Sequence, residues 1–123
     1  MIPSLLLLLA SLMGAAGVVL AAAAAHAAPG AGLDSAAYLL LFHAVAVLGA
    51  SSLAQQGLLW PPAALAAMAG FVLGGVLFAA DVSMRAFAGH RLFPMAAPTG
   101  GTILIIAWLV LASAAIVIIV RGR

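Results

Sequence analysis

Charged residues are so sparse that they divide the chain into long apolar stretches. The segments 1–33, 35–80 and 92–120 contain no Asp, Glu, Lys or Arg. A helix needs about 20 apolar residues to cross a hydrocarbon core about 30 Å thick. The middle stretch is long enough for two crossings, with Gln, Gly and Pro marking a turn between them. The pattern therefore predicts four membrane-spanning helices, with approximate bounds 2–25, 35–54, 62–87 and 99–120.

Turn and cap residues mark the boundaries of these helices. Asp34 and Ser35 follow a Pro- and Gly-rich turn and are predicted to cap the second helix, while Thr99 or Thr102 is predicted to cap the fourth. Trp60 suits the membrane–water interface. No Lys or Arg precedes the first apolar run, so we expect an embedded helix there rather than a secretory signal peptide.

Composition agrees with this pattern. Of the 123 residues, 68% are hydrophobic and 5% are charged, whereas soluble domains carry about a quarter charged residues. We therefore expect an all-α integral membrane protein, a four-transmembrane-helix bundle forming one domain over residues 1–123, with the lipid bilayer as its surroundings. The few arginines form no nucleic-acid surface. The absence of Cys excludes disulfides and thiolate chemistry, and the absence of Lys excludes Schiff-base chemistry.

Small residues are the expected means of packing, because hydrophobicity cannot drive helix association in lipid. Gly70 and Gly74 form a GxxxG pattern in the third predicted helix, and Gly17 and Ala21 have the same spacing in the first. Two interpretations remain open at this point. The small residues either pack the helices of one bundle together, or they form a docking face for another subunit.

Polar residues inside the predicted spans are the candidates for chemistry. Asp81 and Arg85 are four residues apart, which allows an ion pair on one helix face. His43 lies well inside the second span, and a buried imidazole needs hydrogen-bond partners. We predict a hydrogen bond between His43 and Asp81, with Tyr38 and Ser83 as further candidates. The pair is either a structural polar contact or part of a proton relay.

His26 and His90 are expected on the same side of the membrane as His43. Three histidines and one aspartate could in principle bind a metal ion or a haem. No close-spaced ligand motif is present, however, and only His43 lies deep in a span. We therefore predict no catalytic residue, no metal site and no cofactor, and we expect that the protein is not an enzyme.

Four segments, in order along nearly the whole chain, resemble a known family; they cover residues 14–27, 37–48, 74–87 and 93–112. The hallmarks are an Ala–His pair, a Tyr-x4-His pattern and a Pro-x-Gly-Gly motif, here Ala25 with His26, Tyr38 with His43, and Pro98 with Gly100 and Gly101. The pattern resembles the small four-helix inner-membrane family of uncharacterised function typified by the bacterial protein YgdD, with mitochondrial relatives. The resemblance implies a membrane location and a four-helix fold, and no established activity.

Three functional hypotheses fit these observations. The first is a non-catalytic accessory or structural subunit that docks on a larger membrane complex of energy metabolism, with other membrane-protein subunits as partners. The second is a small homo-oligomeric transporter or channel with a proton site at His43 and Asp81. The third is a haem or metal binder that uses His43. We favour the first, because polar residues are too few to line a pore.

Orientation is predicted from the arginines. Four spans place both termini on one face of the membrane, with Arg121 and Arg123 there and Arg85 and Arg91 on the opposite face. Arginines favour the cytoplasmic side. Because Asp81 can neutralise Arg85, we expect a multi-pass protein of the bacterial inner membrane with cytoplasmic termini.

Overall fold

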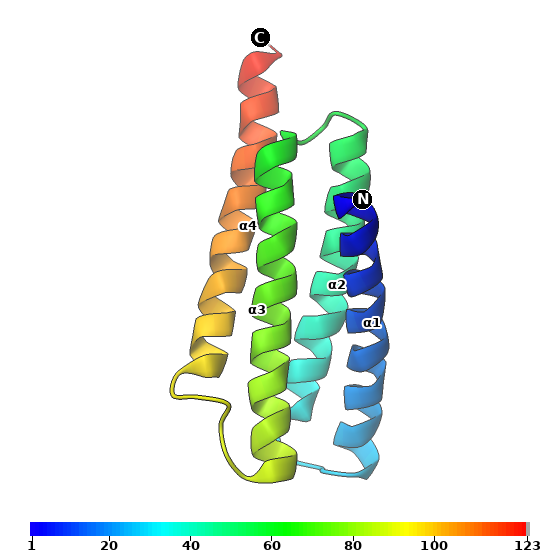
Figure 1. Cartoon of the computed structure of the whole chain (residues 1–123), viewed down its shortest axis with the longest axis vertical. Helices are drawn as coiled ribbons and strands as arrows, with labels where there is room; N and C mark the ends of the chain where they lie inside the picture. Colours follow the sequence, from blue (N-terminus) through cyan, green and yellow to red (C-terminus); the bar gives the residue numbers. More distant parts are fainter. Residues whose placement is uncertain (123) are drawn as a thin grey trace.

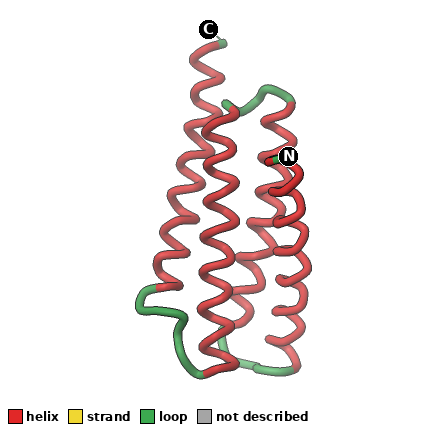
Figure 2. The backbone as a smooth tube through the Cα atoms, viewed as in Figure 1, coloured by secondary structure: helices red, strands yellow, loops and turns green. Residues whose placement is uncertain are grey.

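Four long helices make up the computed structural model, which describes residues 1–122 (Figure 1). They are α1 (Ile2–His26), α2 (Leu33–Gln55), α3 (Pro61–Ala88) and α4 (Ala96–Arg121). Each is long and apolar enough to cross a membrane. The described part of the chain contains no strand, and its loops lie at the two ends of the helices (Figure 2). The predicted all-α, four-helix architecture is confirmed.

The start of α2 differs from the predicted cap. The residue before the helix is Gly32, with a φ of 80°, and no side chain caps the helix. A glycine adopts this left-handed conformation without steric cost. Asp34 therefore lies inside the first turn, and the Ser35 hydroxyl donates to the Gly32 carbonyl oxygen at 3.0 Å. The prediction that Asp34 and Ser35 cap α2 was wrong, because the turn closes through the glycine backbone.

The start of α4 also lies earlier than predicted, at Ala96 rather than near Thr99. Met95 precedes the helix with a φ of 66° and provides no side-chain cap. The Thr102 hydroxyl donates to the Pro98 carbonyl oxygen at 2.9 Å, so it bonds within the helix. The predicted threonine cap was therefore wrong. Pro98 fits in the first turn of α4, where its missing N–H has no helical partner to lose.

The helices pack in chain order. α3 packs on α2 along one side and on α4 along another, while α1 packs mainly on α2. Neighbours run antiparallel, and α4 extends past the start of α3 (Figure 1). In the most apolar part of each helix, 44% of the residues of α2 and α3 are buried, against 22% for α1 and 17% for α4. The core therefore follows α2 and α3, and the outer two helices expose most of their surface.

Glycines set the closest helix crossings. A methyl group added at Gly74 would lie 2.7 Å from the carbonyl oxygen of Gly100, and one at Gly70 would lie 2.8 Å from Cβ of Ala107. A methyl group at Gly17 in α1 would lie 2.7 Å from Cγ of Leu41 in α2. The GxxxG pattern of α3 thus faces α4 of the same chain, where backbone meets backbone.

Candidate functional site

His43 lies at the junction of three helices and is 5% exposed. Its Nδ1 is 2.7 Å from the carbonyl oxygen of Leu39, one turn earlier in α2. Its Nε2 is 3.1 Å from Nε1 of Trp108 in α4. The imidazole also packs on the fully buried ring of Phe71 in α3, with 5.4 Å between ring centroids, and Phe71 packs on Trp108 at 4.8 Å. The cluster of His43, Phe71 and Trp108 therefore joins α2, α3 and α4.

The two hydrogen bonds assign the tautomer of His43. A carbonyl oxygen only accepts and an indole nitrogen only donates. Nδ1 therefore carries the proton and donates to Leu39, while the Nε2 lone pair accepts from Trp108. The neutral ring satisfies both partners. A proton on Nε2 would face the indole N–H donor to donor, and a metal ion or haem iron at Nε2 would have to displace Trp108.

The predicted hydrogen bond between His43 and Asp81 was wrong. Among residues 1–122, the side chain of His43 bonds to Leu39 and Trp108 instead. His43 is level with Phe71, and Asp81 lies ten residues further along α3, about 15 Å away at helical rise. The error has a geometric cause. At the end of the bundle where α2 begins and α3 ends, α3 extends past the first turn of α2 (Figure 1). Two residues that are equally many positions from the start of α2 and from the end of α3 therefore do not lie at the same depth.

Tyr38 and Ser83 do not contact His43 either. Tyr38 is 54% exposed, and its ring stacks on that of Phe42, with 6.1 Å between the ring centroids. Ser83 lies on α3 and lines an apolar groove beside α1. Both were proposed from similar depth alone, and depth does not specify which way a helical side chain points.

Asp81 is fully buried near the end of α3. Its Oδ1 accepts a hydrogen bond of 3.0 Å from the backbone N–H of Leu92, in the α3–α4 loop. Its Oδ2 lies 3.5 Å from Nε of Arg85 and has no hydrogen-bond partner within the described residues. Asp81 and Arg85 thus form the ion pair expected from their spacing. The carboxylate ties the loop to α3, and Arg85 remains partly exposed.

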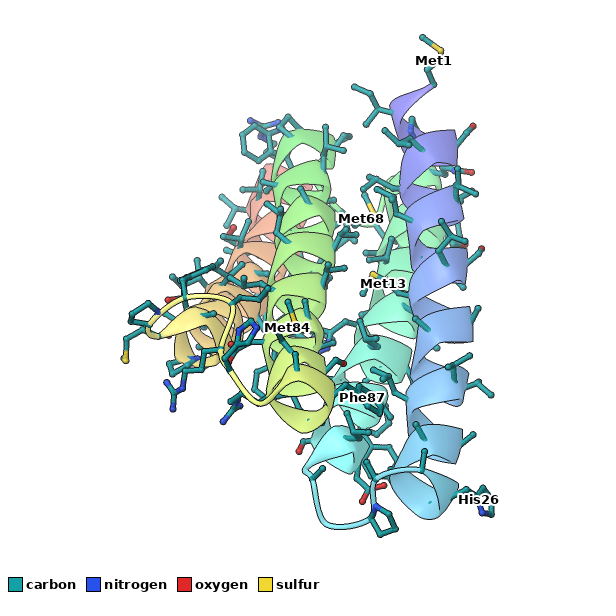
Figure 3. The ribbon with its side chains drawn as sticks, turned by 60° about the horizontal axis from the view of Figure 1, so that its bottom comes forward. Met1, Met13, His26, Met68, Met84 and Phe87 are labelled. Carbon is teal, nitrogen blue, oxygen red and sulfur yellow. The ribbon has the colours of Figure 1, made fainter. Side chains whose placement is uncertain are left out.

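The remaining histidines, His26 and His90, do not belong to the cluster of His43, Phe71 and Trp108. His26 ends α1 and points away from the other helices (Figure 3). His90 is exposed, with Nδ1 3.0 Å from the carbonyl oxygen of Arg91. Within residues 1–122, no three His, Asp or Glu side chains are close enough together to hold a metal ion.

The Pro-x-Gly-Gly motif has a packing role. Gly100 meets α3 at the crossing with Gly74. Gly101 has open space where a side chain would be. Ala21, on the same face of α1 as Gly17, is partly buried. Of this motif, Gly100 is therefore the residue that sets the position of α4 against α3.

Trp108 is the site residue that the sequence reasoning missed. It lies near the middle of α4, although tryptophan in membrane helices favours the interface. An indole N–H at that depth needs an acceptor, because lipid provides none. The sequence does contain a signal for the contact between His43 and Trp108: a tryptophan lies in the middle of one span and a histidine lies in the middle of another.

Two of the cavities between the helices bear on these residues. A groove of about 590 Å³ runs between α1 and α3 and is lined almost entirely by apolar side chains. Met13 of α1 is one of the lining residues, and its side chain points into the space between the helices (Figure 3). A methyl group added at Gly75 of α3 would lie 3.1 Å from Cε of Met13. A smaller cavity of about 340 Å³ lies where α2 begins and α3 ends, and it includes Arg85.

Comparison with known proteins identifies the family of this chain. No curated protein and no solved structure matches the chain. A family model described as "Protein of unknown function (DUF423)" matches residues 13–101. The matched segment contains His43, Asp81 and the Gly74–Gly100 crossing, and it ends before Trp108. This match covers most of the chain, and the protein therefore belongs to the DUF423 family.

Proposed function

We propose that this protein is a non-catalytic accessory subunit that docks within the membrane on a larger complex of membrane proteins. The observation that carries the proposal is how the buried polar groups are used. His43 has both ring nitrogens engaged, and Asp81 holds the backbone of Leu92 and the guanidinium of Arg85. Groups used in this way stabilise contacts between helices and loops, as expected of a structural subunit.

The outer helices provide the surface for docking. Large aliphatic side chains point outward on both of them, including Val18 and Val19 on α1 and Ile105 and Leu109 on α4. Lipid tails are as apolar as these side chains, so a partner would have to bind through close packing. The partner that fits this chemistry is a transmembrane helix of another protein.

Photo-crosslinking in intact membranes tests the proposal. A photoreactive amino acid is placed at Val18 on α1 or at Ile105 on α4, with the fully buried Val47 as a control. We expect the chain to purify in mild detergent with one other membrane protein in a fixed ratio. That same protein should be crosslinked from one of the two outward positions and not from Val47. Deleting the chain should lower the amount of assembled complex, and re-expression should restore it.

Two results would contradict an accessory role. One is purification without any partner at native expression levels, with crosslinks to lipid alone. The other is crosslinking only to a second copy of the chain, which would favour a homo-oligomer.

We also infer that the protein resides in the bacterial inner membrane as a multi-pass protein with cytoplasmic termini. Arg121 lies over the ring of Trp60, 5.3 Å from its centroid, at the end that carries the termini. At the opposite end Arg85 is paired with Asp81, which leaves Arg91 as the other arginine there. The resemblance to the YgdD family supports the same location.

A further inference from the structure

The smaller cavity lies at the end of the molecule that carries the α1–α2 and α3–α4 loops. Its lining comes from the end of the α1–α2 loop, the first turn of α2 and the last turns of α3. Besides Ala31, the residues that line it are Gly32, Ser35, Phe78, Val82, Arg85 and Ala86. No function considered above uses this cavity.

The lining combines an apolar wall with one cation. Phe78, Val82 and Ala86 recur every four residues and form a single apolar stripe on α3. Arg85 stands beside this stripe, with 42% of its side chain exposed. Ser35 provides no free donor, because its hydroxyl bonds to a carbonyl of its own turn. The cavity therefore offers hydrocarbon contact and a guanidinium side by side.

Arg85 is positioned for a second anionic partner. Its Nε faces Oδ2 of Asp81, and Asp81 is itself fixed by the N–H of Leu92. A guanidinium has five N–H donors in a planar fork. Engagement through Nε leaves both terminal nitrogens to bind another group, and within residues 1–122 no hydrogen bond occupies them.

The other charges at this end do not block the cavity. Asp34 precedes Ser35 by one position, about 100° around α2, and does not line the cavity. Arg91 is exposed and adjoins Leu92, whose N–H binds Asp81. The only charged side chain in the lining is therefore a cation.

We propose that this cavity binds the phosphate of a phospholipid headgroup. The terminal nitrogens of Arg85 contact the phosphate oxygens, and the first acyl carbons lie along Phe78, Val82 and Ala86. Arginine pairs with phosphate in a bidentate geometry, and basic pockets between transmembrane helices bind lipid headgroups. A lipid fits better than free phosphate because the guanidinium lies beside the apolar side chains of Phe78, Val82 and Ala86, which free phosphate would leave without a partner. This inference does not depend on the accessory role.

Native mass spectrometry of the full-length protein in mild detergent tests both parts of the proposal, the contact with phosphate and the contact with acyl chains. The probes are phosphatidylglycerol, a diacylglycerol with the same chains and no phosphate, and glycerol 3-phosphate with no chains. We expect one tightly bound phosphatidylglycerol per chain and weak binding of the other two. Arg85→Gln should weaken binding by about tenfold to a hundredfold, as expected for the loss of a charged hydrogen bond. The matched control Arg121→Gln removes an arginine at the opposite end and should leave binding unchanged.

Two further variants keep the test valid if Arg85→Gln unfolds. Asp81→Asn with Arg85→Gln leaves no unpaired buried charge and retains an oxygen for Leu92, and it should also lose the lipid. Ala86→Leu fills the cavity with Arg85 intact and should weaken binding, whereas Ala66→Leu, on an exposed face of α3, should not. Equal binding of diacylglycerol, equal binding of glycerol 3-phosphate, or equal effects of Arg85→Gln and Arg121→Gln would each overturn the proposal.

Discussion

Gly100 and Gly101 are neighbours on α4 with opposite surroundings, and they predict opposite effects of the same substitution. A methyl group at Gly100 would lie 2.8 Å from both the carbonyl oxygen of Gly74 and the amide nitrogen of Phe78. Apart from its chain neighbours and the nearby backbone of α4, a methyl group at Gly101 would meet no heavy atom of the described residues within 4 Å. We expect Gly100→Ala to lower the free energy of unfolding and Gly101→Ala to leave it unchanged or raise it.

The magnitude follows from the difference between the two variants. Both replace glycine with alanine inside one helix, so the propensity gain of about 1 kcal/mol is common to both and cancels. Ordinary van der Waals contacts of a Cβ atom begin at 3.4 Å, so the methyl group at Gly100 requires α3 and α4 to separate by about 0.6 Å. Overpacking of this kind costs about 1–3 kcal/mol. The two variants should therefore differ in stability by about 1–3 kcal/mol.

Equilibrium unfolding in mixed micelles, titrated with a denaturing detergent and followed by circular dichroism, measures this difference. Tryptophan fluorescence gives a second probe, since Trp108 lies on α4. Equal midpoints for Gly100→Ala and Gly101→Ala would refute the close backbone crossing of α3 and α4.

Three further predictions concern the polar contacts and the topology. In a double-mutant cycle, His43→Phe and Trp108→Phe should show a coupling of about 0.6–1.5 kcal/mol in the same unfolding assay, whereas additive effects would contradict the hydrogen bond. Asp81→Leu should lower stability by about 1–3 kcal/mol and expose the α3–α4 loop to protease, because a backbone N–H loses its acceptor; Asp81→Asn should keep most of the protection, and equal loss in both would contradict the assignment. In intact cells, a membrane-impermeant maleimide should label Ala31→Cys and not Gln56→Cys, since the chain has no native cysteine and the two turns lie on opposite sides; the reverse pattern would place the termini outside.

The four helices were predictable because length and apolarity alone determine which segments can cross a membrane. Their ends were less predictable. α2 and α4 begin after backbones in the left-handed conformation, at Gly32 and Met95, and not at a side-chain cap. A Pro- and Gly-rich turn allows several such starting points, and the sequence alone does not choose between them.

The sequence indicated which residues make polar contacts, but for His43 it did not indicate the partner on another helix. The sequence indicated that His43 needs hydrogen bonds, and it located the pair of Asp81 and Arg85, because both inferences depend on a single helix. The bond from His43 to Trp108 depends on how α2, α3 and α4 are rotated and staggered. Those quantities are set by side-chain packing across helices that are distant in sequence, and counting residues from helix ends does not give them.

The seam between α3 and α4 has a mechanical consequence. α4 packs extensively on α3 alone, and at Gly74 and Gly100 the two backbones touch with no side chain between them. Force applied through the end of α4 therefore acts on α3 directly. In single-molecule pulling from that end, α4 and α3 should leave the bilayer together in one rupture, and α2 with α1 should follow in a second.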